Sequence, residues 1–103
     1  MQIQINTDKN ITGGQRLSDY LETVIKDGLE RFSDRITRVE AHLSDEDGSK
    51  EGQNDIKCVL EARIAGRPPI AVTNKANENE KAVHGAIEKL QSALKTMIEK
   101  SSA

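Results

Sequence analysis

The sequence predicts an α+β domain with the element order β-α-β-β-β-α, in which two helices pack on one face of a four-stranded sheet. Four short segments alternate apolar and polar residues, as strands with one covered face do. Two longer segments repeat their apolar residues at every third or fourth position, as amphipathic helices do. The period changes from about 3.6 to 2 at Ser33-Asp34-Arg35, where a helix runs directly into a strand.

The first two elements are a strand at about residues 2–6 and a helix near residues 14–33. In the strand, Ile3 and Ile5 are expected to face the core. Gly28 lies in the apolar stripe of the helix although glycine costs about 1 kcal/mol of helix propensity relative to alanine, which indicates close packing against the sheet or the other helix. The full stripe comprises Leu17, Tyr20, Leu21, Val24, Ile25, Gly28, Leu29 and Phe32.

The remaining elements are three strands and a second helix. The strands are expected at about residues 36–44, 56–65 and 70–74, and Gly66-Arg67-Pro68-Pro69 is a turn because proline cannot donate to a sheet ladder. The helix is expected at roughly residues 78–99, followed by a frayed tail at about 100–103. Its apolar face comprises Ala82, Val83, Ala86, Ile87, Leu90, Ala93, Leu94, Met97 and Ile98.

The connections predict how the strands pair. The first strand reaches the second through a helical crossover, so these two are parallel, and the short later connections make the other strands antiparallel. Both helices then cover one face and leave the other open. The open face comprises Gln2, Gln4, Glu40, His42, Lys57, Val59, Glu61, Arg63, Ala71 and Thr73. It lacks the aromatic rings on which RNA-binding sheets stack bases.

Length and charge bound the class of protein. With 103 residues, the chain is expected to form a single domain, residues 1–103. It has 17 acidic and 15 basic residues, a net charge of −2. Residues 45–55, an expected acidic hairpin loop, hold five acids and one lysine, which is −4 and leaves +2 for the rest. This is a weak basic excess for a nucleic-acid-binding protein.

Little in the sequence supports enzyme chemistry. Cys58 is the only cysteine, which excludes an internal disulfide, and its place on an apolar strand face predicts a buried, unreactive thiol. His42 and His84 are the only histidines and fall on different elements. We therefore expect no enzyme activity, metal, cofactor or small-molecule substrate. Without an apolar span or signal peptide, we expect a cytoplasmic protein with no membrane partner.

Basic residues on the last helix are the best functional candidates. Lys81, Lys89 and Lys95 lie there, interleaved with glutamates. One interpretation is an ordinary solvated face with ion pairs between neighbouring turns. The other is contact with RNA phosphates, in which each cation displaces counterions and binding weakens with salt.

Four segments also resemble a known family. They are Gly28-Leu-Glu-Arg-Phe-Ser-Asp-Arg-Ile36, Val39-Glu-Ala-His-Leu43, Glu61-Ala-Arg-Ile-Ala-Gly66 and Ala82-Val-His-Gly-Ala-Ile-Glu-Lys-Leu90. In this order they are similar to the ribosome hibernation promoting factor and ribosome-associated inhibitor family, also called sigma-factor modulation proteins, in its short form. The similarity covers nearly the whole chain.

The resemblance implies a fold like that of a double-stranded-RNA-binding domain. It implies binding to small-subunit rRNA in the decoding region of the ribosome, so that translation is blocked by occupancy. Lys81, Lys89 and Lys95 would contact the rRNA backbone, with further candidates Arg31, Arg63 and Arg67. Family members tend to carry basic residues at the positions of Ile25, Gly28 and Ser92. The alternative is a diverged member that acts as a protein-interaction module through its open sheet face and acidic loop.

Overall fold

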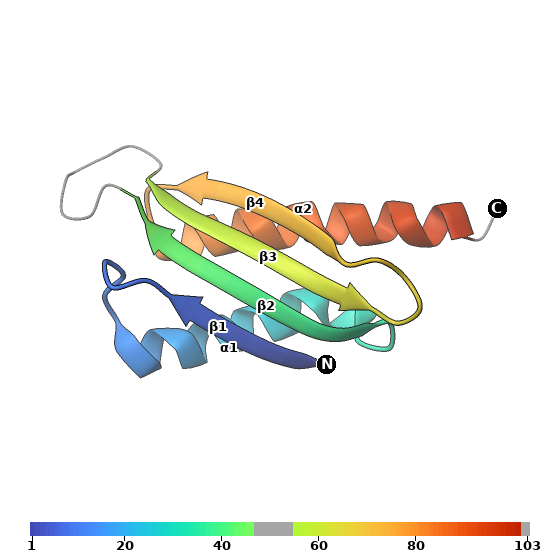
Figure 1. The fold of residues 1–103 in the computed structure, drawn as a ribbon, viewed down its shortest axis with the longest axis horizontal. Coiled ribbons are helices and arrows are strands. Elements are labelled where there is room, and N and C mark those ends of the chain that lie inside the picture. The colour runs from blue at the N-terminus through green and yellow to red at the C-terminus, as the bar shows by residue number, and fades with distance from the viewer. Residues whose placement is uncertain (47–54, 102–103) are drawn as a thin grey trace.

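The computed structural model describes residues 1–46 and 55–101, and it confirms the predicted fold class (Figure 1). The order of elements is β-α-β-β-β-α, with one short 3₁₀ helix, η1, after the first α-helix. The elements are β1 (Gln2–Thr7), α1 (Gly14–Leu29), η1 (Glu30–Phe32), β2 (Ile36–Asp45), β3 (Ile56–Ile64), β4 (Ile70–Ala76) and α2 (Asn79–Ser101).

The strands form one sheet in the order β1-β2-β3-β4. β1 is parallel to β2, with Ile3 opposite Val39, and the other neighbours are antiparallel. Both helices lie against the same face of the sheet, α1 beside β1 and α2 behind β3 and β4 (Figure 1). The predicted helical crossover and the predicted open face are thereby confirmed.

The core is a single layer between the sheet and the two helices. Alternate strand residues such as Val39 and Leu60 are fully buried, and they meet Leu21 and Ile25 from α1 and Leu90 from α2. Burying a leucine or isoleucine side chain stabilises the fold by about 1.5–3 kcal/mol. No polar or charged residue is buried in the described part of the chain, so the fold depends on apolar packing.

Helix α1 ends earlier than predicted. It stops at Leu29, and η1 and a turn lead to β2. Phe32 remains buried because the three-residue step of a 3₁₀ turn places it close to the line of Leu29. The expectation that Tyr20 faces the core is wrong, since it is 45% exposed. The buried arc of α1 is centred on Leu21 and Ile25, and Tyr20 lies beyond its margin.

In the second half of the chain, the ends of two elements also differ from the prediction. β4 continues to Ala76, beyond the expected end at residue 74, and α2 continues through residue 101, where a frayed tail was expected. Most of the expected acidic loop, residues 47–54, lies outside the described residues. At its base the Glu46 N–H donates to the Asp55 carbonyl oxygen (2.9 Å), which joins the ends of β2 and β3.

Gly28 lies where the two helices pack closely against each other. A Cβ atom at this position would stand 2.8 Å from Cγ2 of Ile87 on α2. Gln91 on α2 also donates from Nε2 to the Gly28 carbonyl oxygen (2.7 Å). The prediction that this glycine permits close packing is confirmed, and its neighbour is the other helix.

Cys58 is fully buried in β3, and this burial raises the pKa of its thiol from 9.0 to about 12. Only the thiolate reacts readily with a disulfide reagent. At pH 8 we therefore expect labelling of the native protein to be at least a hundredfold slower than labelling in denaturant. The thiol of the unfolded chain ionises at a lower pH than the buried thiol of the native protein. The free energy of unfolding should therefore fall as the pH rises above about 9. Rapid native labelling would contradict the assigned burial.

Candidate RNA-binding surface

The exposed face of α2 carries the three lysines that the sequence singled out. Lys81, Lys89 and Lys95 are all exposed. At a rise of 1.5 Å per residue, the first and last of them lie about 21 Å apart along the helix axis. They therefore span a length of surface over which several phosphates of an RNA strand could be contacted.

Lys81 is held weakly by one neighbour. Its Nζ lies 3.8 Å from Oε2 of Glu78, three residues earlier, and both side chains are more than 60% exposed. An exposed pair of this kind contributes between about 0 and 1 kcal/mol. A phosphate can therefore replace Glu78 as the partner of Lys81 with little loss of stability.

Lys89 contacts the edge of the sheet. Its Nζ donates a hydrogen bond to the backbone carbonyl oxygen of Thr73 in β4 (2.8 Å). β4 is an outer strand, so this carbonyl oxygen has no partner strand on that side. An ammonium group has three hydrogens, so Lys89 can bind Thr73 and an external anion together.

The lysines do not form an unbroken positive strip. With 100° per residue, Lys81 and Lys95 lie about 40° apart around the helix and Lys89 about 80° from Lys81. Glu88 and Glu99 fall on the same arc as Lys81 and Lys95, and both are exposed. The surface is therefore a row of alternating charges in which single cations are available, and the lack of an unbroken strip favours the protein-interaction alternative.

Arg31 and Lys95 are the two candidates that meet at one place. They line a shallow pocket together with Phe32, Ile98 and Glu99, where η1 lies beside the last turns of α2. The guanidinium of Arg31 stacks over the Phe32 ring, with its carbon 4.7 Å from the ring centroid. A cation–π contact at an exposed position stabilises this orientation by about 0.5–1 kcal/mol. The arrangement places two cations and the carboxylate of Glu99 around an apolar floor.

Arg63 and Arg67 lie apart from the lysines. Arg63 is on the open sheet face, opposite α2, where it pairs with Glu40 (3.3 Å) and Glu61 (3.8 Å). Arg67 lies in the turn between β3 and β4, and its backbone N–H donates to the Ile64 carbonyl oxygen (3.2 Å). The six predicted residues therefore do not form one site.

The open sheet face contains an arginine that the sequence reasoning missed. Arg38 donates from Nη1 to Gln2 (3.2 Å), from Nη2 to Gln4 and from Nε to Glu40 (3.4 Å). Arg38 lies two residues before Glu40 and four before His42, so the alternation of a strand predicts all three on the same face. The β2–β3 register shifts between Ile36 and Arg38, which obscures the alternation at the start of β2.

The structure places the two histidines on opposite sides of the sheet. His42 lies on the open face with Nε2 3.8 Å from Oε1 of Glu40, and His84 lines a groove between the helices beside Asp27. Within residues 1–46 and 55–101, no three side chains of the metal-binding types gather at one point. Of the helices described, none combines the length and apolar composition that a membrane span requires.

The fold and the exposed cations define a small α+β domain with candidate phosphate contacts on its last helix. The chain belongs to the family described as "Sigma 54 modulation protein / S30EA ribosomal protein", whose profile matches residues 3–102. This membership supports association of the protein with the ribosome. No curated protein sequence matches the chain.

Two solved structures share the fold. One is the N-terminal domain of Protein Y from Thermus thermophilus, with a TM-score of 0.72 and 18% identity over 94% of this chain and 99% of that one. The other is a ribosomal subunit interface protein from Coxiella burnetii, with a TM-score of 0.66 and 18% identity over 96% and 99%. At this identity the likeness concerns the fold alone.

The structure explains two of the departures from the family pattern. Ile25 is completely buried, and Gly28 lies against Ile87. A basic side chain at either position would point into the protein. These residues are therefore part of the packed core of the protein. Ser92 is exposed on α2 and lines a shallow pocket with Lys89, so the third departure does fall on the candidate surface.

Proposed function

We propose that this protein binds the small ribosomal subunit in its decoding region and inhibits translation by occupying the path of mRNA and tRNA. Family membership supports the ribosome as the partner. The observation that carries the finer proposal is the exposed face of α2, where Lys81, Lys89 and Lys95 are available to phosphates. The action requires no bond to be made or broken, and it takes place in the cytoplasm.

The contacts of the lysines support binding to an RNA backbone. Lys81 has a weak, solvent-exposed partner, and Lys89 keeps two hydrogens after binding Thr73. Lys95 and Arg31 flank one apolar floor, on which a sugar or base could rest between two phosphate contacts. Arg63 and Arg67 belong to the proposal as secondary contacts outside this surface.

Co-sedimentation with purified small ribosomal subunits tests the proposal. The protein should pellet with the small subunit at low salt and be released progressively as the salt concentration rises, because each phosphate contact displaces counterions. Purified large subunits are the matched control and should retain little protein. Failure to pellet with the small subunit even at low salt would end the proposal.

A second candidate function is a protein-interaction module. The observation that favours it is the open sheet face, where Arg38, Glu40 and Arg63 are joined by ion pairs and hydrogen bonds into a mixed-charge surface. With the net charge of −2, such a surface suits a protein partner with basic groups. A pull-down that recovers one non-ribosomal protein and no rRNA would favour this function over the first.

A further inference from the structure

Among residues 1–46 and 55–101, no strand pairs with the outer edge of β1, so its outward backbone groups lack a partner strand. In a parallel ladder, every second residue of a strand turns its N–H and C=O groups toward the same neighbouring strand. The Asp8 N–H donates to the Leu43 carbonyl oxygen (3.1 Å), and this bond shows which residues of β1 face β2. Even-numbered residues of β1 therefore bond to β2. Ile3, Ile5 and Thr7 direct their N–H and C=O groups away from the sheet.

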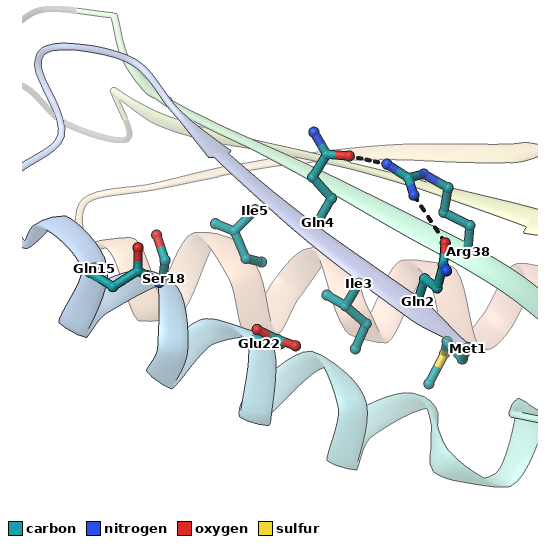
Figure 2. Close-up of a pocket in the computed structure, with 9 residues that line it drawn as sticks. All are labelled: Met1, Gln2, Ile3, Gln4, Ile5, Gln15, Ser18, Glu22 and Arg38. Atoms are coloured by element: carbon teal, nitrogen blue, oxygen red, sulfur yellow. Dashed lines mark hydrogen bonds between the residues drawn. The ribbon is translucent and has the colours of Figure 1, made fainter.

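A groove runs along this edge between β1 and α1 (Figure 2). Ile3 and Ile5 point toward the helix side, whereas Gln2 and Gln4 turn to the open face and bind Arg38. None of these side chains folds over the outer edge. The helix wall of the groove is formed by Gln15, Ser18 and Glu22.

The two edges of the sheet differ in their protection. On β4, Lys89 reaches from α2 and binds the outward carbonyl oxygen of Thr73. Proteins usually guard exposed edges with lysine, proline, a bulge or a covering element. β1 contains neither lysine nor proline, and its ladder with β2 runs without a shift from Gln2 to Thr7. An edge of this kind is suited to pairing with another strand.

We propose that β1 is a pairing site for a second copy of this chain, with the two β1 strands antiparallel in one continuous sheet. The sequence Gln2-Ile3-Gln4-Ile5-Asn6 has nearly the same pattern in both directions. A two-fold axis requires a surface that is complementary to itself, and a palindromic strand provides one. In the register that centres this pattern on the two-fold axis, Gln4 faces the partner's Gln4 and Ile3 faces the partner's Ile5.

Both faces of the paired strands are chemically matched in this register. On the helix side the half-buried Ile3 and Ile5 of the two copies form one apolar row above the joined grooves. On the open side, Gln2 faces the partner's Asn6. An amide carries two donor hydrogens and an oxygen with two lone pairs, so Gln2 and Gln4 can bind Arg38 and a partner amide together.

Charge also favours a second copy over other occupants. Among the side chains that line the groove, only those of Glu22 and Arg38 are charged, so the two-fold arrangement brings no acidic or basic cluster of side chains together. A carboxylate beside the edge opposes a nucleic-acid strand. The surface is separate from the lysines of α2, and the pairing is independent of the proposed function.

Charge substitutions at Gln4 test this pairing. Sedimentation velocity of the intact chain from micromolar to millimolar concentration should show a monomer–dimer equilibrium. In Gln4→Glu, the ion pair with Arg38 preserves the monomer, but two carboxylates oppose each other across the axis. We expect the dimer to weaken about tenfold, and less at high salt. Thr73→Glu adds the same charge on β4 and should leave the dimer unchanged.

A mixture identifies the interface directly. Gln4→Lys alone should also weaken the dimer, whereas an equimolar mixture of Gln4→Glu and Gln4→Lys chains should form heterodimers. Circular dichroism checks that each variant is folded. In a second measurement, hydrogen exchange at Ile3 and Ile5 should slow with increasing protein concentration. A protein that stays monomeric at all concentrations would overturn the pairing. A dimer that Gln4→Glu and Thr73→Glu weaken equally would also overturn it. Binding of a foreign extended peptide without self-association would assign the edge to a different partner.

Discussion

Replacing Lys81, Lys89 and Lys95 together by alanine is expected to abolish most of the salt-sensitive affinity for the small ribosomal subunit. Each lost phosphate contact lowers the slope of log affinity against log salt by about 0.7–0.9. The slope should therefore fall by about 2–3 in the triple variant. The fold should survive, because all three side chains are exposed. Filter binding or sedimentation over a range of salt concentrations measures the slope.

A second triple variant separates the α2 surface from net charge. Lys9, Lys57 and Lys75 lie outside α2, and their replacement by alanine changes the charge by the same amount. This variant should retain most of the affinity and the salt slope of the native protein. If both triple variants lose affinity equally, binding depends on the overall charge of the protein and the α2 surface is not the interface.

Gly85→Ala is expected to lower the free energy of unfolding by about 2–3 kcal/mol. A Cβ atom at residue 85 would stand 2.1 Å from Nδ2 and 2.6 Å from Cγ of Asn74. In the native protein this amide donates to the carbonyl oxygens of Ala82 (3.2 Å) and Lys81 (3.4 Å), which joins β4 to the first turns of α2. The new methyl group must expel the Asn74 side chain, and the gain in helix propensity of about 1 kcal/mol offsets only part of the loss.

A double variant tests that cause. Asn74→Ala alone removes the two hydrogen bonds and should cost about 1–2 kcal/mol. In that background there is room for the Cβ atom, so Gly85→Ala should be neutral or stabilising by up to about 1 kcal/mol. Urea denaturation of the four proteins gives the coupling energy. If Gly85→Ala lowers the free energy of unfolding equally in both backgrounds, the contact with Asn74 is not the cause of the destabilisation.

The order and type of the elements were predictable because each depended on a strong local pattern. Cys58, Leu60 and Ala62 alternate with polar residues in β3, and the structure buries all three. The end of α1 was harder to place, because Leu29 and Phe32 have a spacing that fits an α-helix and a 3₁₀ turn equally well. The prediction ended β4 at Asn74, whereas the structure continues the strand over Lys75 to Ala76, whose side chain is buried.

The candidate site was less predictable than the fold because it depends on contacts between distant elements. The bond from Lys89 to Thr73 requires the angle at which α2 crosses β4, which no local pattern contains. The meeting of Arg31 with Lys95 depends on η1, whose turn was expected to be α-helical. The number of exposed cations could be predicted, and their grouping could not.

The contact between Lys89 and Thr73 has a consequence for how far this protein can assemble. A sheet that is open at both margins can add molecules without limit and grow into a fibre. Here the ammonium group occupies one carbonyl oxygen of the β4 margin, which opposes the addition of a further strand there. Lys89 is thus placed to act as a safeguard against runaway aggregation, and its loss would expose a margin that polymerisation requires.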